Sequence, residues 1–328
     1  TRCSRDWSSD VCSSDLALFE DLDNELNGWL IHSENYQALN TLRAKYNEQA
    51  QIIYIDPPFN TGSDFDYEDK FQDSTWLTII NERIELARLL LNENGTFYLH
   101  LDHNANFLGR HLMDNLFGQD NLLNELIWYY SNKIPDTRKK RYTNATDIIY
   151  SYSKKFGKHI FNWQFDKRNK PIKVSKMKKV DGKKIYLKDE FGNGIYDIRD
   201  ERTADNFWNF SLLHAQPEIV NFQTQKPELL LQRIVNTSSN NGGFIIDFFT
   251  GSATTIAVAH KLNRKWLGVE MGEHFYAIDI PRMKNVLFGR QVGITEEVEF
   301  IGGGFFKYYS LEQYEETLSK IKYEDKGA

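Results

Sequence analysis

Short apolar runs alternate with amphipathic segments along most of the chain. Residues 52–55 are apolar or aromatic, and a segment with helical periodicity follows and ends at Asn94-Gly95. Further strand-like runs are GTFYLHLD, ELIWYYS, TDIIYSYS, GGFIIDFF and KWLGVEM, and helix-like segments are ANFLGRHLMDNLFG, PELLLQRIVNTSS and SATTIAVAHKLN. The segment HFYAIDIPRMKNVLFG predicts a helix interrupted near Pro281, and the end of the chain predicts a strand and a last helix. This alternation predicts an α/β fold with a doubly wound, mostly parallel sheet.

Two regions fall outside this alternation. Residues 164–206 are Lys-rich and hydrophilic and contain the turn pairs Asp181-Gly182 and Asn193-Gly194, so we expect an insertion there. Residues 1–16 are rich in Ser and Asp and have no amphipathic period, so we expect a non-native or disordered leader. Because no Met begins the chain, we also expect a truncated N-terminus.

The charge is unevenly distributed. The net charge is -6, yet residues 131–190 contain 18 Lys or Arg and 6 Asp or Glu. One basic block on an acidic body predicts a polyanion-binding region, whose densest part is Lys133, Arg138, Lys139, Lys140 and Arg141. A solvated loop is the alternative, but aromatic residues interleave with these charges, and disordered segments are poor in aromatics.

Cysteine and hydropathy exclude several classes of protein. Cys3 and Cys12 are the only cysteines, which excludes a disulfide framework and a zinc-cysteine site in the body of the fold. No His or carboxylate set has metal-ligand spacing either, so we predict no metal. A reducing, cytoplasmic location fits this composition. No run of about 18 apolar residues occurs, so we expect no membrane span.

The segment FIIDFFTGSATT combines a strand, a glycine turn and a helix start. The predicted strand ends at Asp247, the turn contains Gly251, and the next strand ends at Glu270, an acid placed to bond ribose hydroxyls. The fingerprint Gly-x-Gly-x-x-Gly is missing, and Asp247 would repel a pyrophosphate. A cationic, nucleoside-bearing cofactor fits better, with S-adenosylmethionine as the candidate. A purely structural glycine turn is the alternative.

The sequence Asp56-Pro57-Pro58-Phe59 follows the run at 52–55 directly. Two prolines keep the backbone extended and rigid, so the Asp56 carboxylate and the Pro57 carbonyl form a fixed pair of acceptors. Their natural partner is an exocyclic amine with two N–H donors, and Phe59 offers a flat face for a planar base. An ordinary Asp-Pro turn is the alternative for these residues alone.

With both constellations present, the chain resembles an amino-group DNA methyltransferase. DPPF is similar to that family's DPPY-type catalytic motif, and DFFTGS is similar to its cofactor motif. The catalytic motif precedes the cofactor motif, as in the circularly permuted β class. IDPPFNTG and FFKYYSLEQYEETL resemble modification subunits of type III restriction-modification systems. Phe59 stands where the family usually has Tyr, and Ala253 stands where it usually has Gly.

The resemblance implies a role for each matched residue. The catalytic residues would be Asp56, Pro57, Pro58 and Phe59, and DNA would be bound by the basic cluster Lys133, Arg138, Lys139, Lys140 and Arg141. The cofactor S-adenosylmethionine would be bound by Glu34, Asn60, Lys226, Asp247, Phe248, Gly251, Ser252, Thr254 and Glu270, with Lys226 in a Thr-Gln-Lys-Pro segment that packs against the methionine part.

The resemblance also implies a division of the chain and a reaction. Residues 17–160 would form the catalytic half of a Rossmann-like methyltransferase domain, 161–210 a target-recognition insertion, and 211–328 the cofactor-binding half with a C-terminal extension. The implied activity is methyl transfer to adenine N6 in DNA, after the base has been flipped out of the duplex. A restriction subunit and a second copy of the chain are the further partners that the family suggests.

Several alternatives stay open or are excluded. Cytosine N4 is the other target, although that class more often begins its motif with Ser. A degenerate, non-catalytic DNA-binding module of the same fold is possible on sequence grounds, because Ala253 departs from the family pattern. A nicotinamide dehydrogenase is disfavoured by the missing glycine fingerprint. A cytosine C5 enzyme is excluded because no Cys follows a Pro.

Overall fold

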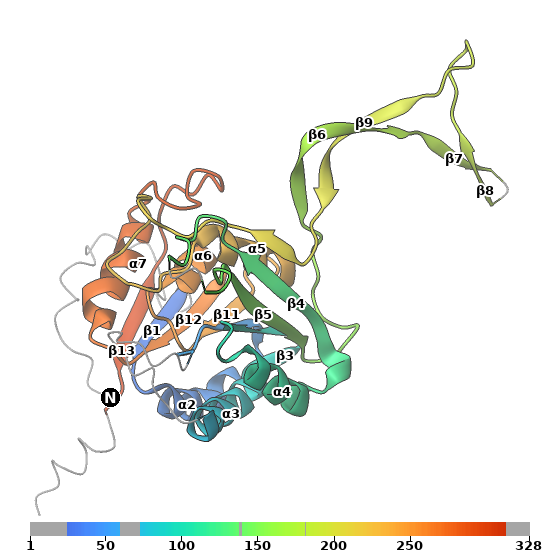
Figure 1. Ribbon diagram of the computed structural model, residues 1–328. Coiled ribbons are helices and arrows are strands. Elements are labelled where there is room, and N and C mark those ends of the chain that lie inside the picture. Colours follow the sequence, from blue (N-terminus) through green and yellow to red (C-terminus); the bar gives the residue numbers. More distant parts are fainter. Residues whose placement is uncertain (1–24, 60–72, 138–139, 181, 313–328) are drawn as a thin grey trace, which may run out of the picture. The chain divides into compact units, whose positions relative to one another are not determined.

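The computed structural model describes residues 25–59, 73–137, 140–180 and 182–312. The described chain forms two compact units: residues up to Asn162 together with those from Asn206 onward, and Trp163–Asp205. The larger unit is built on a nine-stranded sheet of order β10-β4-β5-β3-β2-β11-β12-β1-β13 (Figure 1). Its strands are β1 (Gly28–His32), β2 (Ala50–Ile55), β3 (Leu91–Leu101), β4 (Leu122–Tyr129), β5 (Thr146–Ser153), β10 (Phe207–Asn209), β11 (Phe244–Asp247), β12 (Lys265–Glu270) and β13 (Phe306–Ser310).

The sheet is almost entirely parallel. Neighbouring strands pair in parallel from β3 across to β13, and β10 pairs in parallel with β4. Only β5 runs against its neighbours, β3 and β4, because β4 returns to β5 through a loop without a crossover helix. The predicted α/β, mostly parallel fold is therefore confirmed.

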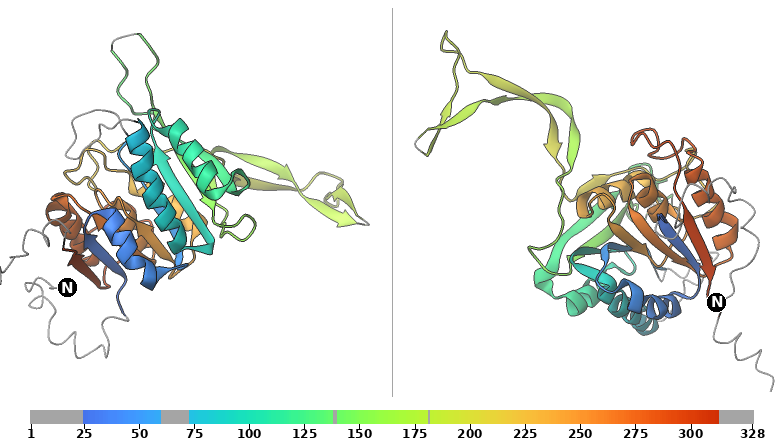
Figure 2. Two further views of the ribbon diagram at one scale, coloured as in Figure 1. Left: turned by 90° about the horizontal axis from the view of Figure 1, so that it is seen from below. Right: turned by 180° about the vertical axis from the view of Figure 1, so that it is seen from behind.

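Helices cover both faces of the sheet (Figures 1 and 2). Alternation along β2 explains the two layers: Ile53 and Ile55 enter one apolar core, whereas Ile52 and Tyr54 enter the other. The first core is covered by α2 (Asn35–Tyr46), α3 (Asp73–Leu90) and α4 (Asn106–Phe117), which the 3-10 turn η1 (Gln119–Asn121) follows. The second core is covered by α5 (Glu228–Ser238), α6 (Thr254–Lys261), η2 (Phe275–Asp279) and α7 (Ile280–Leu287).

Two predicted boundaries need correction or refinement. The helix expected to end at Asn94-Gly95 ends at Leu90, because Leu91 is fully buried and already pairs with Ala50 in the sheet. Asn94-Gly95 instead lies where the register between β2 and β3 shifts, and a Cβ on Gly95 would lie 2.8 Å from the Ala50 carbonyl oxygen. Pro281 lies in the first turn of α7, directly after the π-helical η2. The predicted last helix lies outside the described residues.

The smaller unit consists of two antiparallel ribbons. The first pairs β6 (Phe165–Ser175) with β9 (Tyr196–Thr203), and the second pairs β7 (Met177–Val180) with β8 (Lys183–Tyr186). None of its described residues is buried, so it has no apolar core of its own. Lys179 lies directly opposite Lys184 in the second ribbon, a repulsive pairing unless an anion lies nearby. In neither unit does a described helix have the length and apolar character needed to cross a bilayer.

Candidate active site

Three acidic residues meet at the carboxyl edge of the sheet. Asp56 follows β2, Asp247 ends β11 and Glu270 ends β12, and these strands are parallel neighbours. All three line one cavity of about 460 Å³, which lies within the usual size range of small-molecule sites. The same cavity is lined by the other predicted catalytic and cofactor residues that the structure describes: Glu34, Pro57, Pro58, Phe59, Lys226, Phe248, Gly251, Ser252 and Thr254. Asn60 lies outside the described residues.

The Asp56-Pro57-Pro58-Phe59 segment is fixed from α3. The indole Nε1 of Trp76 donates a hydrogen bond of 2.7 Å to the Pro58 carbonyl, and Trp76 is almost fully buried. Asp56 accepts a hydrogen bond from the Lys226 ammonium through Oδ2. Its other oxygen, Oδ1, is buried and has no hydrogen-bond partner among the described residues. A buried carboxylate oxygen without a donor is an acceptor that a ligand can satisfy.

A buried polar chain lies behind this segment. The Tyr54 hydroxyl lies 2.7 Å from Nδ1 of His100, whose Nε2 lies 3.2 Å from Asp147, and the Tyr130 hydroxyl donates to the same carboxylate. Burial opposes ionisation of Asp147, but its contacts with His100 lower its pKa overall. The His100 ring lies 6.0 Å from the Phe59 ring, so this chain supports the aromatic wall of the cavity.

The glycine turn after β11 has a left-handed backbone at two positions. Gly251 has φ +56° and Ala253 has φ +61°. The second value explains why the family pattern has Gly at this position, because a left-handed Ala is strained by about 1–2 kcal/mol. The methyl group of Ala253 is fully buried in the core behind the turn. The departure noted in the sequence therefore affects backbone strain, and Ala253 does not line the cavity.

The pKa values of the acidic groups around the turn are shifted in opposite directions. Burial raises the pKa of Asp247 to about 7, although its Oδ1 accepts a hydrogen bond from the Phe249 N–H. Burial also acts on Glu270, but the contact with His274 and backbone N–H donors lower its pKa overall. One of these donors is Gly251 at 2.8 Å, so the acid at the end of β12 occupies an N–H of the glycine turn.

The cavity wall near α2 is also held by a polar network. Glu34 caps α2 by accepting a hydrogen bond from the Gln37 N–H at 3.0 Å, and Arg83 donates to Glu34 at 2.5 Å. Asn35 donates to the carbonyl oxygen of Phe248 at 3.0 Å. These contacts connect the helix after β1 to the cofactor-motif segment after β11.

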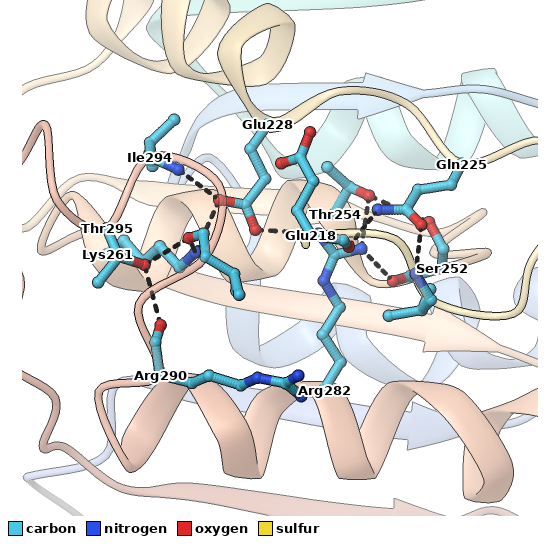
Figure 3. Close-up of polar contacts among 12 residues, drawn as sticks. Glu218, Gln225, Glu228, Ser252, Thr254, Lys261, Arg282, Arg290, Ile294 and Thr295 are labelled. Atoms are coloured by element: carbon cyan, nitrogen blue, oxygen red, sulfur yellow. Dashed lines mark hydrogen bonds and ion pairs between the residues drawn. The ribbon is translucent and has the colours of Figure 1, made fainter. Parts of the chain in front are cut away.

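A cluster of buried charged residues from α5, α6 and α7 stabilises the glycine turn. Arg282 of α7 donates to the Ser252 carbonyl and to the Thr254 hydroxyl, both at 2.8 Å, and to Glu228 at 3.0 Å (Figure 3). Lys261 of α6 donates to the other oxygen of Glu228 at 2.7 Å. Because Glu228 is the first residue of α5, the cluster joins the Thr-Gln-Lys-Pro segment to the glycine turn.

Several lining residues escaped the sequence reasoning. Trp76, Arg83 and His274 line the cavity and come from segments without a recognisable motif, whereas Phe222 also lines it and lies two residues before the Thr-Gln-Lys-Pro segment. Trp76 is part of the apolar stripe of α3 and looked like an ordinary core residue. Arg282 had no signal beyond its place in a helix.

The basic loop between β4 and β5 begins at the same edge of the sheet, because β4 is parallel in direction to β3. Lys133, Lys140 and Arg141 are exposed, and Arg141 makes a loose ion pair of 3.5 Å with Asp136. Arg138 and Lys139 lie outside the described residues. The described part of the cluster is thus accessible to a polyanion.

Known proteins are similar to this chain in sequence and in fold. Residues 50–280 match the family model N6_N4_Mtase, described as DNA methylase. The chain is 26% identical to the "Probable type III restriction-modification enzyme HindVI Mod subunit" of Haemophilus influenzae, over 89% of this chain and 55% of that protein. It therefore spans about half the length of this relative. It is 27% identical to DNA adenine methyltransferase YhdJ of Escherichia coli, over 77% of this chain and 82% of that protein.

Two solved structures have the same fold. PvuII DNA methyltransferase, which is cytosine-N4-specific, superposes with a TM-score of 0.56 at 15% identity, over 88% of this chain and 96% of that chain. The complex of M1.HpyAVI with SAM superposes with a TM-score of 0.52 at 16% identity, over 78% of this chain and 98% of that chain.

Proposed function

Because the chain belongs to the DNA methylase family, we propose that it transfers a methyl group from S-adenosylmethionine to N6 of adenine in DNA. The observation that carries this proposal is that the Asp56 carboxylate, the Phe59 ring and the Gly251 turn line one cavity. An acceptor for the target amine and a turn for a nucleoside cofactor thus face one space.

The residues of the cavity fit the cofactor. Asp56, Asp247 and Glu270 line it, and carboxylates favour a cationic ligand over a pyrophosphate. Glu270 ends the strand next to β11, where an acid can accept hydrogen bonds from ribose hydroxyls. Gly251, Ser252 and Thr254 would hold the ligand beside the start of α6. When bound, S-adenosylmethionine supplies an electrophilic methyl group on a sulfonium.

Asp56 and the Pro57 carbonyl would act on the nucleophile. The lone pair of an adenine amine is delocalised into the ring, so the amine is a weak nucleophile. Two acceptors that bind both N–H groups draw the nitrogen toward tetrahedral geometry and direct its lone pair at the methyl group. As the N–C bond formed and the S–C bond broke, the nitrogen would lose one proton, which the Asp56 carboxylate would accept.

Phe59 would hold the target base. An amine inside a stacked duplex cannot reach Asp56, so the base must be flipped into the cavity. The Phe59 ring lines the cavity beside Asp56 and is supported by His100 from behind. Base–aromatic stacking contributes about 1–3 kcal/mol per base.

We propose that the β4–β5 loop, with Lys133, Arg138, Lys139, Lys140 and Arg141, binds the DNA backbone. Phosphate contacts of this kind give sequence-independent affinity with a steep salt dependence. The recognition of a particular sequence is assigned to the insertion at 161–210. A restriction subunit and a second copy of the chain are proposed as partners on the resemblance to type III systems alone.

The test is to express the chain in a host that lacks DNA methyltransferases and to sequence the host DNA for modified bases. We expect N6-methyladenine within one recognition sequence. N4-methylcytosine in its place would move the assignment to the other amino-group target. Unmodified DNA from cells that contain the folded protein would contradict the activity and favour a non-catalytic DNA-binding module.

A further inference from the structure

The ammonium group of Lys226 occupies the place proposed for the target amine. It donates a hydrogen bond to Oδ2 of Asp56 and lies 5.3 Å from the centroid of the Phe59 ring, above its face. A weaker contact of 3.4 Å reaches the Thr224 carbonyl. One nitrogen cation therefore contacts both the acceptor and the aromatic surface that a flipped base would need.

This contact excludes the substrate while it lasts. Oδ2 of Asp56 and the face of Phe59 cannot hold the ammonium group and an exocyclic amine on a stacked ring at the same time. The ion pair is also shielded, since the side chains of Lys226 and Asp56 are 10% and 18% exposed. A shielded ion pair is not displaced without a replacement partner, because an unpaired buried charge is strongly unfavourable.

The other basic groups of the cavity already have partners on the cavity wall. Arg83 donates to Glu34, Asn35 and the Ile79 carbonyl, and His274 lies 3.3 Å from Glu270. Lys226 is the basic lining residue, among those described, whose carboxylate partner is the proposed catalytic group. S-adenosylmethionine carries a carboxylate of its own, which needs a cation in a cavity lined by Asp56, Asp247 and Glu270.

The base of Lys226 is fixed while its side chain is long and flexible. Pro227 follows it directly and forms the N-cap of α5, and Glu228 is held by Lys261, Arg282 and the Ile294 N–H (Figure 3). A four-carbon side chain on a rigid backbone can redirect its charge by rotamer changes alone. No movement of the sheet or of α5 is required.

We propose that Lys226 exchanges partners, from Asp56 in the empty site to the carboxylate of the methyl donor in the loaded site. Binding of the donor then clears Asp56 and the face of Phe59 for the target base. The inference rests on the proposed function and adds an order to it, because the donor must enter before the base can be held. Lys226 acts as a positioning residue that couples the two subsites.

The exchange predicts a coupling that calorimetry can measure without DNA. The two probes are S-adenosylmethionine and its decarboxylated analogue, titrated into the wild-type chain, Asp56→Asn, Lys226→Met and the double variant. Lys226→Met should weaken S-adenosylmethionine about tenfold or more, the effect of one charge-assisted hydrogen bond, without weakening the analogue. Asp56→Asn should release Lys226 and raise the preference for S-adenosylmethionine over the analogue several-fold.

The double variant distinguishes an effect of Asp56→Asn that acts through Lys226 from a direct effect of the lost Asp56 charge on the ligand. If Lys226 mediates the effect, Asp56→Asn should shift the preference much less when Met replaces Lys226. An equal shift in both backgrounds, or equal weakening of both probes by Lys226→Met, would overturn the proposal. Lys265→Met, the same charge change at an exposed position outside the cavity, should leave both affinities unchanged.

The calorimetric coupling and the search for modified bases in host DNA can fail independently of each other. A failed coupling together with N6-methyladenine in host DNA would remove the exchange and leave the methyltransferase assignment standing. If the coupling between Lys226 and Asp56 is intact but host DNA is unmodified, methyl transfer is contradicted and the cofactor site is supported.

Discussion

Burial of Glu218 should make the free energy of unfolding depend on pH, and one substitution should remove this contribution. Its Oε2 is buried and has no partner among the described residues. A Cβ on Gly293 would lie 2.8 Å from this oxygen and 2.0 Å from Oε2 of Glu228, so both acids face the same backbone. Burial, and then the charge of Glu228, raise the pKa of Glu218 from 4.5 to about 7, against the opposing charges of Arg282 and Lys261.

The direction of this pH dependence follows from the number of protons that the folded and unfolded chains bind. Well below pH 4.5 Glu218 is protonated in both the folded and the unfolded chain, and its titration does not affect stability. As pH rises toward 7, the unfolded chain releases this proton while the folded chain retains it, so the free energy of unfolding falls. Each pKa unit corresponds to about 1.4 kcal/mol, which gives an upper limit of about 3 kcal/mol; partial access to water reduces this to about 1–2 kcal/mol.

Glu218→Gln removes the titrating group and keeps the shape of the side chain. Urea unfolding should be measured from pH 4 to 8 for the wild type and the variant, with Glu296→Gln as the exposed control on a nearby loop. The variant should gain about 1–2 kcal/mol relative to the wild type as pH rises through this interval. Asp247 also titrates near 7, but it contributes equally to both proteins. A difference between variant and wild type that is independent of pH would contradict a raised pKa for Glu218.

Three further predictions concern contacts around the cavity and the proposed DNA-binding loop between β4 and β5. Trp76→Phe removes the hydrogen bond to the Pro58 carbonyl; it should lower stability by about 1 kcal/mol in urea unfolding and reduce the rate of methyl transfer more than the affinity for the cofactor. Arg282→Met leaves Glu228 with only Lys261 and the Ile294 N–H and should cost about 2–4 kcal/mol in the same assay, with weaker calorimetric binding of S-adenosylmethionine; unchanged stability would exclude the supporting role. Charge reversal at Lys139 and Lys140 should weaken DNA binding on all sequences alike and flatten its dependence on salt, whereas an effect on one sequence only would assign these residues to base recognition.

Local sequence patterns were sufficient to predict the strands and the glycine turn that line the cavity. The apolar runs before Asp56 and Asp247 are short; Pro57-Pro58 follows the first acid directly, and Gly251 lies in the turn after the second. Because the carboxyl ends of parallel strands share one edge of the sheet, predicting the strands also predicted that these acids meet. The unusual Ala253 was visible as a departure from the family pattern, and the left-handed φ of +61° gives its physical meaning.

The sequence was insufficient where a contact joins distant segments. Lys226 and Asp56 are 170 residues apart, and no periodicity indicates that they pair. Trp76 reads as a core residue of α3, although its indole nitrogen also fixes Pro58. The end of α3 was misplaced because a turn pair, Asn94-Gly95, is used inside a strand at a register shift. Local propensity was overridden there by burial of Leu91 in the sheet.

We propose that Asp56 acts on the target amine while the Gly251 turn holds the methyl donor in the same cavity. Asp56→Ala tests it most directly, with transfer of a radiolabelled methyl group to unmodified genomic DNA and calorimetric titration of S-adenosylmethionine measured on the same preparation. We expect methyl transfer to fall by about a hundredfold or more, while the cofactor binds as tightly as before or more tightly. Methyl transfer at the wild-type rate, or loss of cofactor binding in proportion to activity, would contradict it.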